Sequence, residues 1–116
     1  MKVRAHAKHV PMSARKVRRV IDLVRGMDAE EALEVLRFLP HAAARPVAKV
    51  IRSAIANAEE NFGIAREDLY IAHIVADEGP GVAPGKGWRP RYGARGRYRP
   101  IRKRSTHITV VLDERV

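Results

Sequence analysis

The sequence predicts an α+β fold, with three helices, strands near both ends of the chain and a long basic β-hairpin. Three observations support this class. Basic and small residues alternate over residues 2–10, apolar residues recur at helical spacing between Ser13 and Gly63, and two runs rich in Val, Ile and Thr flank a segment of Gly, Pro and Arg. With 116 residues, we expect a single domain spanning residues 1–116.

The first element is a strand over residues 2–10. Side chains alternate between the faces of a strand, so this pattern gives one basic face and one small apolar face. Pro11 ends the strand. The basic side carries Lys2, Arg4, His6 and Lys8, and the apolar side carries Val3, Ala5, Ala7 and His9.

The next element is a helix from Ser13, as N-cap, to about Arg25, with Gly26 as its stop. Arg15 and Lys16 fall in its first turn, where the helix dipole disfavours cations, so we interpret this end as a phosphate-binding site. A solvated basic face is the alternative. Arg18 and Arg19 lie on the outer side. The predicted buried stripe is Val17, Val20, Ile21 and Val24.

Two further helices follow, and we assign them a structural role. Asp28 and Glu31 match a capping box, and Pro40 ends the second helix. The third covers roughly residues 42–62, provided that Pro46 lies in its first turn, and Gly63 ends it. The predicted apolar stripes are Ala29, Ala32, Leu33, Leu36 and Leu39 in the second helix, and Val47, Val50, Ile51, Ala54 and Ala58 in the third.

Two strand-like runs, Leu69–Asp77 and Thr106–Leu112, flank the basic segment, so we expect them to pair as the antiparallel roots of one hairpin. The globular part is then residues 1–78 and 105–116, and the basic hairpin is residues 79–104. The basic hairpin has too little apolar surface to offset its ordering entropy, so it should order on a partner and reach about 40 Å. A disordered Arg- and Gly-rich tail is the alternative, and the strand-like run that follows the segment argues against it.

The whole chain has a net charge of +10, and its positive charge is concentrated toward the two ends. Between Gly79 and Leu112 there are seven Arg, two Lys and no acid, with aromatic residues among them. Arg guanidinium groups bind RNA phosphates in a two-point fashion, and aromatic rings stack on RNA bases. From charge and aromaticity the candidate RNA-binding residues are Lys2, Arg4, Lys8, Arg15, Lys16, Arg18, Arg19, Lys86, Trp88, Arg89, Arg91, Arg95, Arg97, Arg99, Arg102, Lys103 and Arg104.

Other function classes find little support. The chain has no cysteine, no apolar run long enough to cross a membrane, no histidine at metal-ligand spacing and no nucleophile–base pair. We therefore expect a cytoplasmic protein that is not an enzyme, with no cofactor, metal, membrane or small-molecule substrate. Duplex-DNA binding through the Ser13–Arg25 helix and a small hydrolase are the weaker alternatives, because that helix offers only Arg, Lys and Asp for reading bases.

Three stretches together resemble one family. They read MSARKVRRVIDLVRG over residues 12–26, SAIANAEEN over 53–61, and DEGP over 77–80 with KRSTHITVV over 103–111. In this order they are similar to the bacterial-type ribosomal large-subunit protein twenty-two family, essentially from end to end. The segment after Pro80 reads GVAPGKGWR, where the family usually has a Lys-Arg pair, and the hairpin is a few residues longer.

The resemblance implies three helices packed on a small antiparallel sheet, with a protruding hairpin. It also implies binding to large-subunit rRNA, a role in subunit assembly, contact with neighbouring ribosomal proteins, and a hairpin that lines the exit tunnel beside the nascent peptide. It places helix-one RNA contacts at Ser13, Arg15, Lys16 and Arg18. The returning root of the hairpin corresponds to Lys103, Arg104, Ser105, Thr106 and His107.

Overall fold

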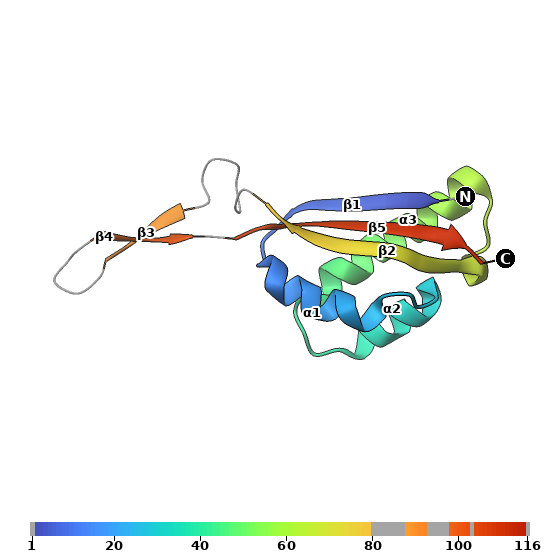
Figure 1. Ribbon diagram of the computed structural model, residues 1–116, viewed down its shortest axis with the longest axis horizontal. Coiled ribbons are helices and arrows are strands. Elements are labelled where there is room, and N and C mark those ends of the chain that lie inside the picture. Colours follow the sequence, from blue (N-terminus) through green and yellow to red (C-terminus); the bar gives the residue numbers. More distant parts are fainter. Residues whose placement is uncertain (1, 80–87, 93–97, 103, 116) are drawn as a thin grey trace.

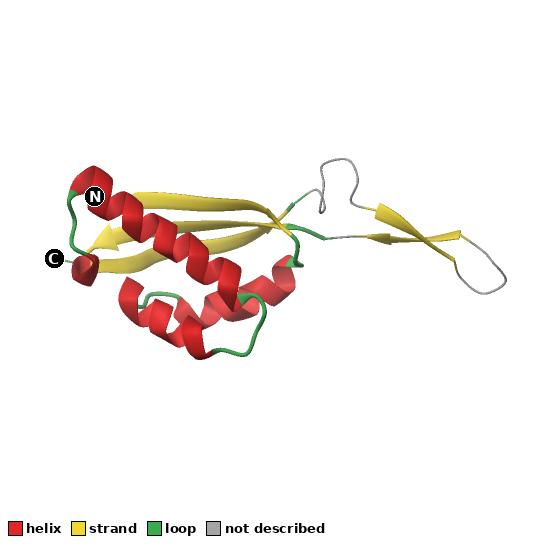
Figure 2. Ribbon diagram, turned by 180° about the vertical axis from the view of Figure 1, so that it is seen from behind, coloured by secondary structure: helices red, strands yellow, loops and turns green. Residues whose placement is uncertain are grey.

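The structure, a computed structural model, describes residues 2–79, 88–92, 98–102 and 104–115, and within 88–92 and 98–102 it describes the backbone alone. Three helices cover one face of a three-stranded antiparallel sheet, which confirms the predicted α+β class (Figure 1). Figure 2 shows the helices in front of the sheet, and none of the described helices covers the opposite face, which is toward the viewer in Figure 1. The elements of this part are β1 (Val3–Val10), α1 (Ala14–Val24), α2 (Ala29–Phe38), α3 (Ala44–Phe62), the short 3-10 helix η1 (Arg66–Asp68), β2 (Leu69–Glu78) and β5 (Thr106–Glu114).

The last strand of the chain is the centre of this sheet, whose order is β1-β5-β2. Strand β5 pairs antiparallel with β2 from Leu69↔Glu114 to Glu78↔Thr106. The predicted antiparallel roots are therefore confirmed. Strand β1 pairs with the other edge of β5, so both ends of the chain meet in one sheet.

The core lies between the sheet and the helices. Ile108, Val110 and Leu112 of β5 are fully buried. They are joined by Val3 and Ala5 of β1 and by Leu69, Ile71, Ile74 and Ala76 of β2, where a register shift after Ile71 interrupts the alternation. The predicted apolar stripes of α1 and α3 are buried as expected, and in α2 Leu33 and Leu39 are partly buried at the margin. The helices contribute Val17, Val20, Ile21, Val24, Ala29, Ala32, Leu36, Val47, Val50, Ile51, Ala54, Ile55 and Ala58.

The third helix ends as its sequence predicts. Gly63 has a φ of 65°, in the left-handed region that a glycine adopts without steric penalty. The Ile64 N–H donates to the Ala58 carbonyl at 3.2 Å, which closes the helix end. Pro46 lies in the first turn, where its missing N–H removes no intrahelical bond.

The predicted capping box at Asp28 is wrong in its side-chain contacts. Asp28 lies at the N-cap position but its carboxylate makes no cap hydrogen bond. It binds the guanidinium of Arg115 instead. Arg115 also donates to the Gly26 carbonyl at 3.3 Å and lies 4.6 Å from the centre of the Tyr70 ring. The carboxylate thus ties the start of α2 to the end of the chain.

The alternation predicted for the first strand fails at its end. Val3 and Ala5 are buried, as predicted, but His9 is exposed and has a φ of 58°. The pairing register with β5 shifts between Ala7 and Val10, which is the signature of a β-bulge. The bulge turns the His9 side chain out of the apolar face.

A second, two-stranded sheet lies beyond the end of the first (Figure 1). Strands β3 (Trp88–Tyr92) and β4 (Tyr98–Arg102) pair antiparallel, and the register places Arg91 opposite Arg99. The molecule measures 63 × 27 × 16 Å, and its radius of gyration is 17.0 Å. A compact chain of this length has a radius of gyration of about 13 Å. The protruding hairpin of the predicted fold accounts for the difference.

Candidate nucleic-acid interface

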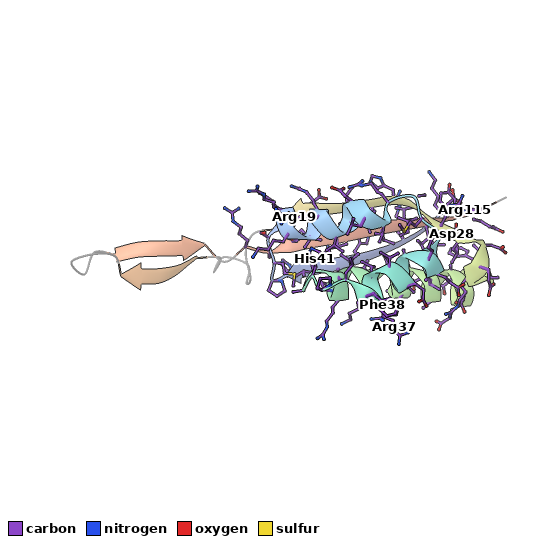
Figure 3. All side chains as sticks on the ribbon, turned by 90° about the horizontal axis from the view of Figure 1, so that it is seen from below. Arg19, Asp28, Arg37, Phe38, His41 and Arg115 are labelled. Carbon is purple, nitrogen blue, oxygen red and sulfur yellow. The ribbon has the colours of Figure 1, made fainter. Side chains whose placement is uncertain are left out.

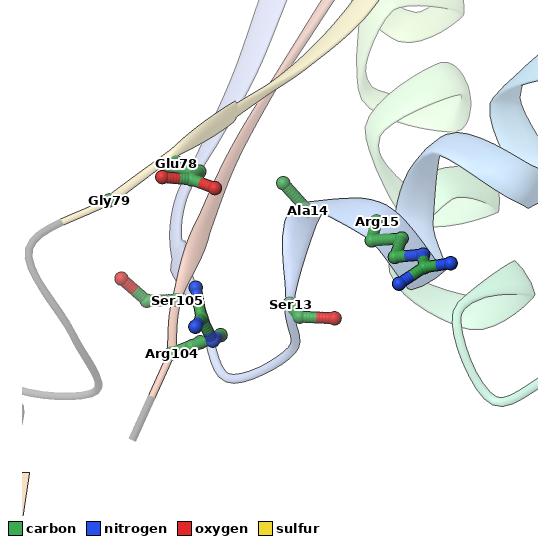
Figure 4. A pocket seen from close by; sticks show the side chains of 7 residues that line it. All are labelled: Ser13, Ala14, Arg15, Glu78, Gly79, Arg104 and Ser105. Carbon is green, nitrogen blue, oxygen red and sulfur yellow. The ribbon is translucent and has the colours of Figure 1, made fainter. Parts of the chain in front are cut away.

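Three segments that are far apart in the sequence meet where the hairpin leaves the sheet. Residues 13–15 begin α1, residues 78–79 end β2, and residues 104–105 lead into β5. Together they surround a hollow of about 300 Å³ (Figure 4). We call these seven residues the root surface.

Backbone pairing brings these segments together. The Gly79 N–H donates to the Ser105 carbonyl at 2.9 Å, one step beyond the last pair of the β2–β5 ladder. A Cβ at Gly79 would collide with the Ser105 hydroxyl and lie 3.2 Å from the His107 ring. The Thr106 hydroxyl donates to the Met12 carbonyl at 2.6 Å, which holds the start of α1 against β5.

The chemistry of the root surface suits an anion. Ser13 has extended backbone angles and its hydroxyl does not cap α1, so the first turn keeps N–H groups available. This turn contains no acid, and Arg15 and Arg104 add two cations beside it. Glu78 is the single carboxylate in the lining. Helix N–H groups and guanidinium groups together bind phosphate well.

A basic row extends from the root surface along the exposed side of α1. Arg15, Lys16 and Arg19 are exposed, and none of them forms an ion pair within the described part of the chain. Arg18 differs, because its Nε donates to the Ala76 carbonyl of β2 at 3.0 Å. That bond fixes the Arg18 side chain across the end of the sheet.

The basic face of β1 is exposed, as its alternation predicts. Lys2, Arg4 and Lys8 all point away from the core. On the same strand His6 lies 3.1 Å from the Thr109 hydroxyl of β5. The sheet face that no helix covers therefore presents cations along its β1 edge.

Three residues assigned to the returning root have contacts within the fold. Ser105 is 2% exposed and Thr106 is fully buried. The Nδ1 of His107 accepts the His9 N–H at 3.2 Å, and the two imidazole rings pack edge to face with their centres 5.0 Å apart. Thr106 and His107 therefore support the root surface from within the fold, whereas Ser105 lines the hollow although it is almost fully buried.

The hairpin candidates divide into two groups. Trp88, Arg89, Arg91, Arg99 and Arg102 lie on β3 and β4, where the structure gives their backbone register. Lys86, Arg95, Arg97 and Lys103 lie outside the described residues.

Sequence reasoning did not assign Ala14, Glu78 or Gly79 to the site, although all three line the hollow. A signal for Gly79 was available, since it stands at the boundary between the Val- and Ile-rich strand and the basic segment. Glu78 has the wrong charge for an RNA contact, and only the fold shows that it lines the same hollow as Arg104. Within the described ranges there is no cluster of potential metal ligands and no helix long and apolar enough to span a bilayer.

Comparison with known proteins gives consistent relatives. The family described as ribosomal protein L22p/L17e matches residues 5–113. The chain is 51% identical to the large ribosomal subunit protein uL22 of Thermoanaerobacter sp. (strain X514), and the 115 aligned residues cover 99% of each chain. It is 49% identical to the protein of that name from Carboxydothermus hydrogenoformans, over 99% of this chain and 97% of the relative.

Proposed function

Because this chain belongs to the ribosomal protein L22p/L17e family, we propose that it binds large-subunit rRNA through the root surface and the basic hairpin. Membership makes it a structural ribosomal protein of the cytoplasmic large subunit and not an enzyme. The finer statements, which concern RNA contacts, assembly and the exit tunnel, are our proposal.

The convergence of cations at the root surface carries this proposal. Arg15 and Arg104 are separated by most of the chain, yet both line one hollow at the uncapped start of α1. A fold with no anionic partner gains nothing from cations at the positive end of a helix dipole. An rRNA phosphate in the hollow would compensate both guanidinium groups and the helix N–H groups.

The hairpin extends this contact away from the sheet. Arg91 and Arg99 occupy facing positions on β3 and β4, and like charges opposite each other destabilise a two-stranded sheet. Phosphates on either side of the hairpin would remove that repulsion. The length of the molecule is consistent with a hairpin that passes between rRNA segments. There the hairpin would assist subunit assembly and line the tunnel beside the nascent peptide. Neighbouring ribosomal proteins would then contact the acidic outer side of α2.

Binding to a transcribed large-subunit rRNA fragment tests this proposal. We expect R15Q/R104Q to weaken binding and to reduce the slope of log affinity against log salt, by about 0.7 to 0.9 for each lost phosphate contact. The control N61D/A65E changes the net charge equally at two exposed positions near the end of α3. Equal slopes for the two variants would contradict a role for the root surface.

A further inference from the structure

A second cationic surface lies on the helical side of the molecule, between α2 and α3. It is an open groove of about 1120 Å³ whose floor includes Leu33, Leu36 and Leu39. Four cations, Arg37, Arg45, Lys49 and Arg52, line it. Between Asp22 and Glu78, where acids outnumber bases, the sequence holds only six Lys and Arg in all. Most of the positive charge of this acidic region is therefore gathered in one groove, which we call the α2–α3 groove.

The cations of α3 have no acidic partner in the described part of the chain. Arg45, Lys49 and Arg52 are exposed, and no described residue forms an ion pair with them. Four acids of this region pair with other cations. Asp22 pairs with Arg25, Asp28 pairs with Arg115, and both Glu30 and Glu59 pair with Arg66. Glu34 is the one carboxylate in the groove lining.

This arrangement opposes helix stability. Arg45, Lys49 and Arg52 are spaced by four and three residues, so they form one row of like charges on α3. Arg45 also stands in the first turn, which contains no acid. The start of α2, by contrast, carries Glu30 and Glu31. A row of cations that weakens its own helix is explained by an anion bound outside the helix.

An exposed aromatic ring lies next to the groove. Phe38 ends α2 and is 76% exposed, and the Arg37 guanidinium lies 5.6 Å from the centre of its ring. Figure 3 shows Arg37 and Phe38 projecting from the helical side, well away from Arg19 of α1. An exposed ring beside cations offers a stacking surface to an unpaired base, whereas the bases of a duplex are already stacked.

The groove also continues into the site already described. Met12 is among the residues that line the groove, and its carbonyl accepts the Thr106 hydroxyl beside the root surface. Beside Met12 in the chain, Ser13 begins the root surface. The adjacency of Met12 and Ser13 in the chain places the two surfaces next to each other, so one RNA strand could contact both.

We infer that the α2–α3 groove is a second RNA-binding surface that takes an unpaired RNA segment. The phosphates lie along Arg45, Lys49 and Arg52, and a base stacks on Phe38. The inference rests on the proposed function in that the partner is RNA, but it uses residues outside the root surface and the basic hairpin.

Nuclear magnetic resonance of the full chain with a dodecamer of uridylate locates the binding. We expect the amides of residues 37–52 to shift, in addition to those of residues 13–16 and 104–107. In R45Q/K49Q/R52Q the shifts at residues 37–52 should disappear while those at residues 13–16 remain. The salt slope should fall by about two, since each single-strand phosphate contact contributes about 0.7. The control R25Q/N61D/A65E carries the same change of net charge outside the groove and should keep the shifts.

Substitution of Phe38 separates stacking from apolar packing. F38L keeps an apolar side chain without a ring and should weaken dodecamer binding about tenfold, whereas F38Y should bind like the parent chain. Full binding by F38L would contradict stacking.

Several outcomes would overturn the inference. Shifts at residues 13–16 with none at residues 37–52 would contradict RNA binding in the α2–α3 groove and would leave the proposed function intact. Shifts at residues 37–52 alone would support the groove and contradict the root surface. No shift in either region would contradict both the groove inference and RNA binding by the root surface. An amphipathic peptide of Leu and Glu that shifts residues 37–52 at lower concentration than the dodecamer would show that the groove takes an acidic protein segment instead.

Discussion

The two ends of the sheet differ in whether their charged side chains are paired within the chain. At the end where α2 begins, Asp28 binds Arg115, and Arg66 binds Glu59 and Glu30 close by. At the hairpin end, Arg15 and Arg104 face one hollow, and no ion pair involves either of them in the described ranges. At the first end the charges are paired within the chain, whereas at the second the proposed function requires an anion to pair with them. Stability and binding should therefore respond to different substitutions.

Removing charge from the hairpin should produce the largest effect. The variant R89Q/R91Q/R99Q/R102Q should lower the salt slope of binding to an rRNA fragment by about three and the affinity at ~0.1 M salt by about several hundredfold. Its free energy of unfolding should stay within about 0.5 kcal/mol of the parent value, because no core residue changes. Affinity is read by fluorescence anisotropy across a salt series. An unchanged slope would contradict the comparison.

A core substitution should do the reverse. Ile51 is fully buried under the sheet, so I51A should lower the free energy of unfolding by about 2–5 kcal/mol, and I51V by about 0.5–1.5 kcal/mol. Denaturant unfolding measures both. The salt slope of the folded fraction should match that of the parent chain. A reduced slope in I51A would mean that core packing and RNA contact are not separable.

Gly79 lies at the boundary between the sheet and the hairpin, so its substitution tests how the two are joined. Its missing Cβ leaves room for the Ser105 hydroxyl, so G79A should destabilise the fold by about 1–3 kcal/mol through overpacking. The double variant G79A/S105A removes that oxygen and should recover part of the loss, which a double-mutant cycle measures. Strictly additive effects would show that the two residues do not share this space.

The smallest expected effect is a change in stability whose sign distinguishes a binding role from a structural one. Arg15 and Lys16 stand in the first turn of α1, so R15Q/K16Q should stabilise the free chain by about 0.3–1 kcal/mol for each residue while weakening RNA binding. Thermal unfolding and anisotropy on the same sample measure both quantities. A loss of stability in R15Q/K16Q would mean that these cations serve the fold.

Much of the fold could be predicted because its signals are local. The helical spacing of Val17, Val20 and Ile21, the stop at Gly63 and the two runs that flank the basic segment all lie within short stretches of sequence. The failures involve distant residues. The capping box at Asp28 was wrong because Arg115, from the other end of the chain, takes the carboxylate. The bulge at His9 arises from pairing with β5, which no pattern within residues 2–10 reveals.

The candidate site was predictable as a set of residue types but not as a shape. Arg15 and Arg104 could be selected by charge, yet only the β2–β5 ladder shows that they share one hollow. The cations of the α2–α3 groove were missed because averaging charge between Asp22 and Glu78 gives an acidic region. The spacing of Arg45, Lys49 and Arg52 was visible in the sequence and would have shown one helical row.

Amide hydrogen exchange on the full chain, with and without an rRNA fragment, tests most directly whether the hairpin end needs RNA. We predict that amides of β2, β5 and the three helices exchange slowly in both samples. Amides of residues 88–92 and 98–102 should exchange rapidly in the free chain and become protected when the fragment is added. Strong protection without RNA of the eight amides in these two strands, which each contain one proline, would contradict the account.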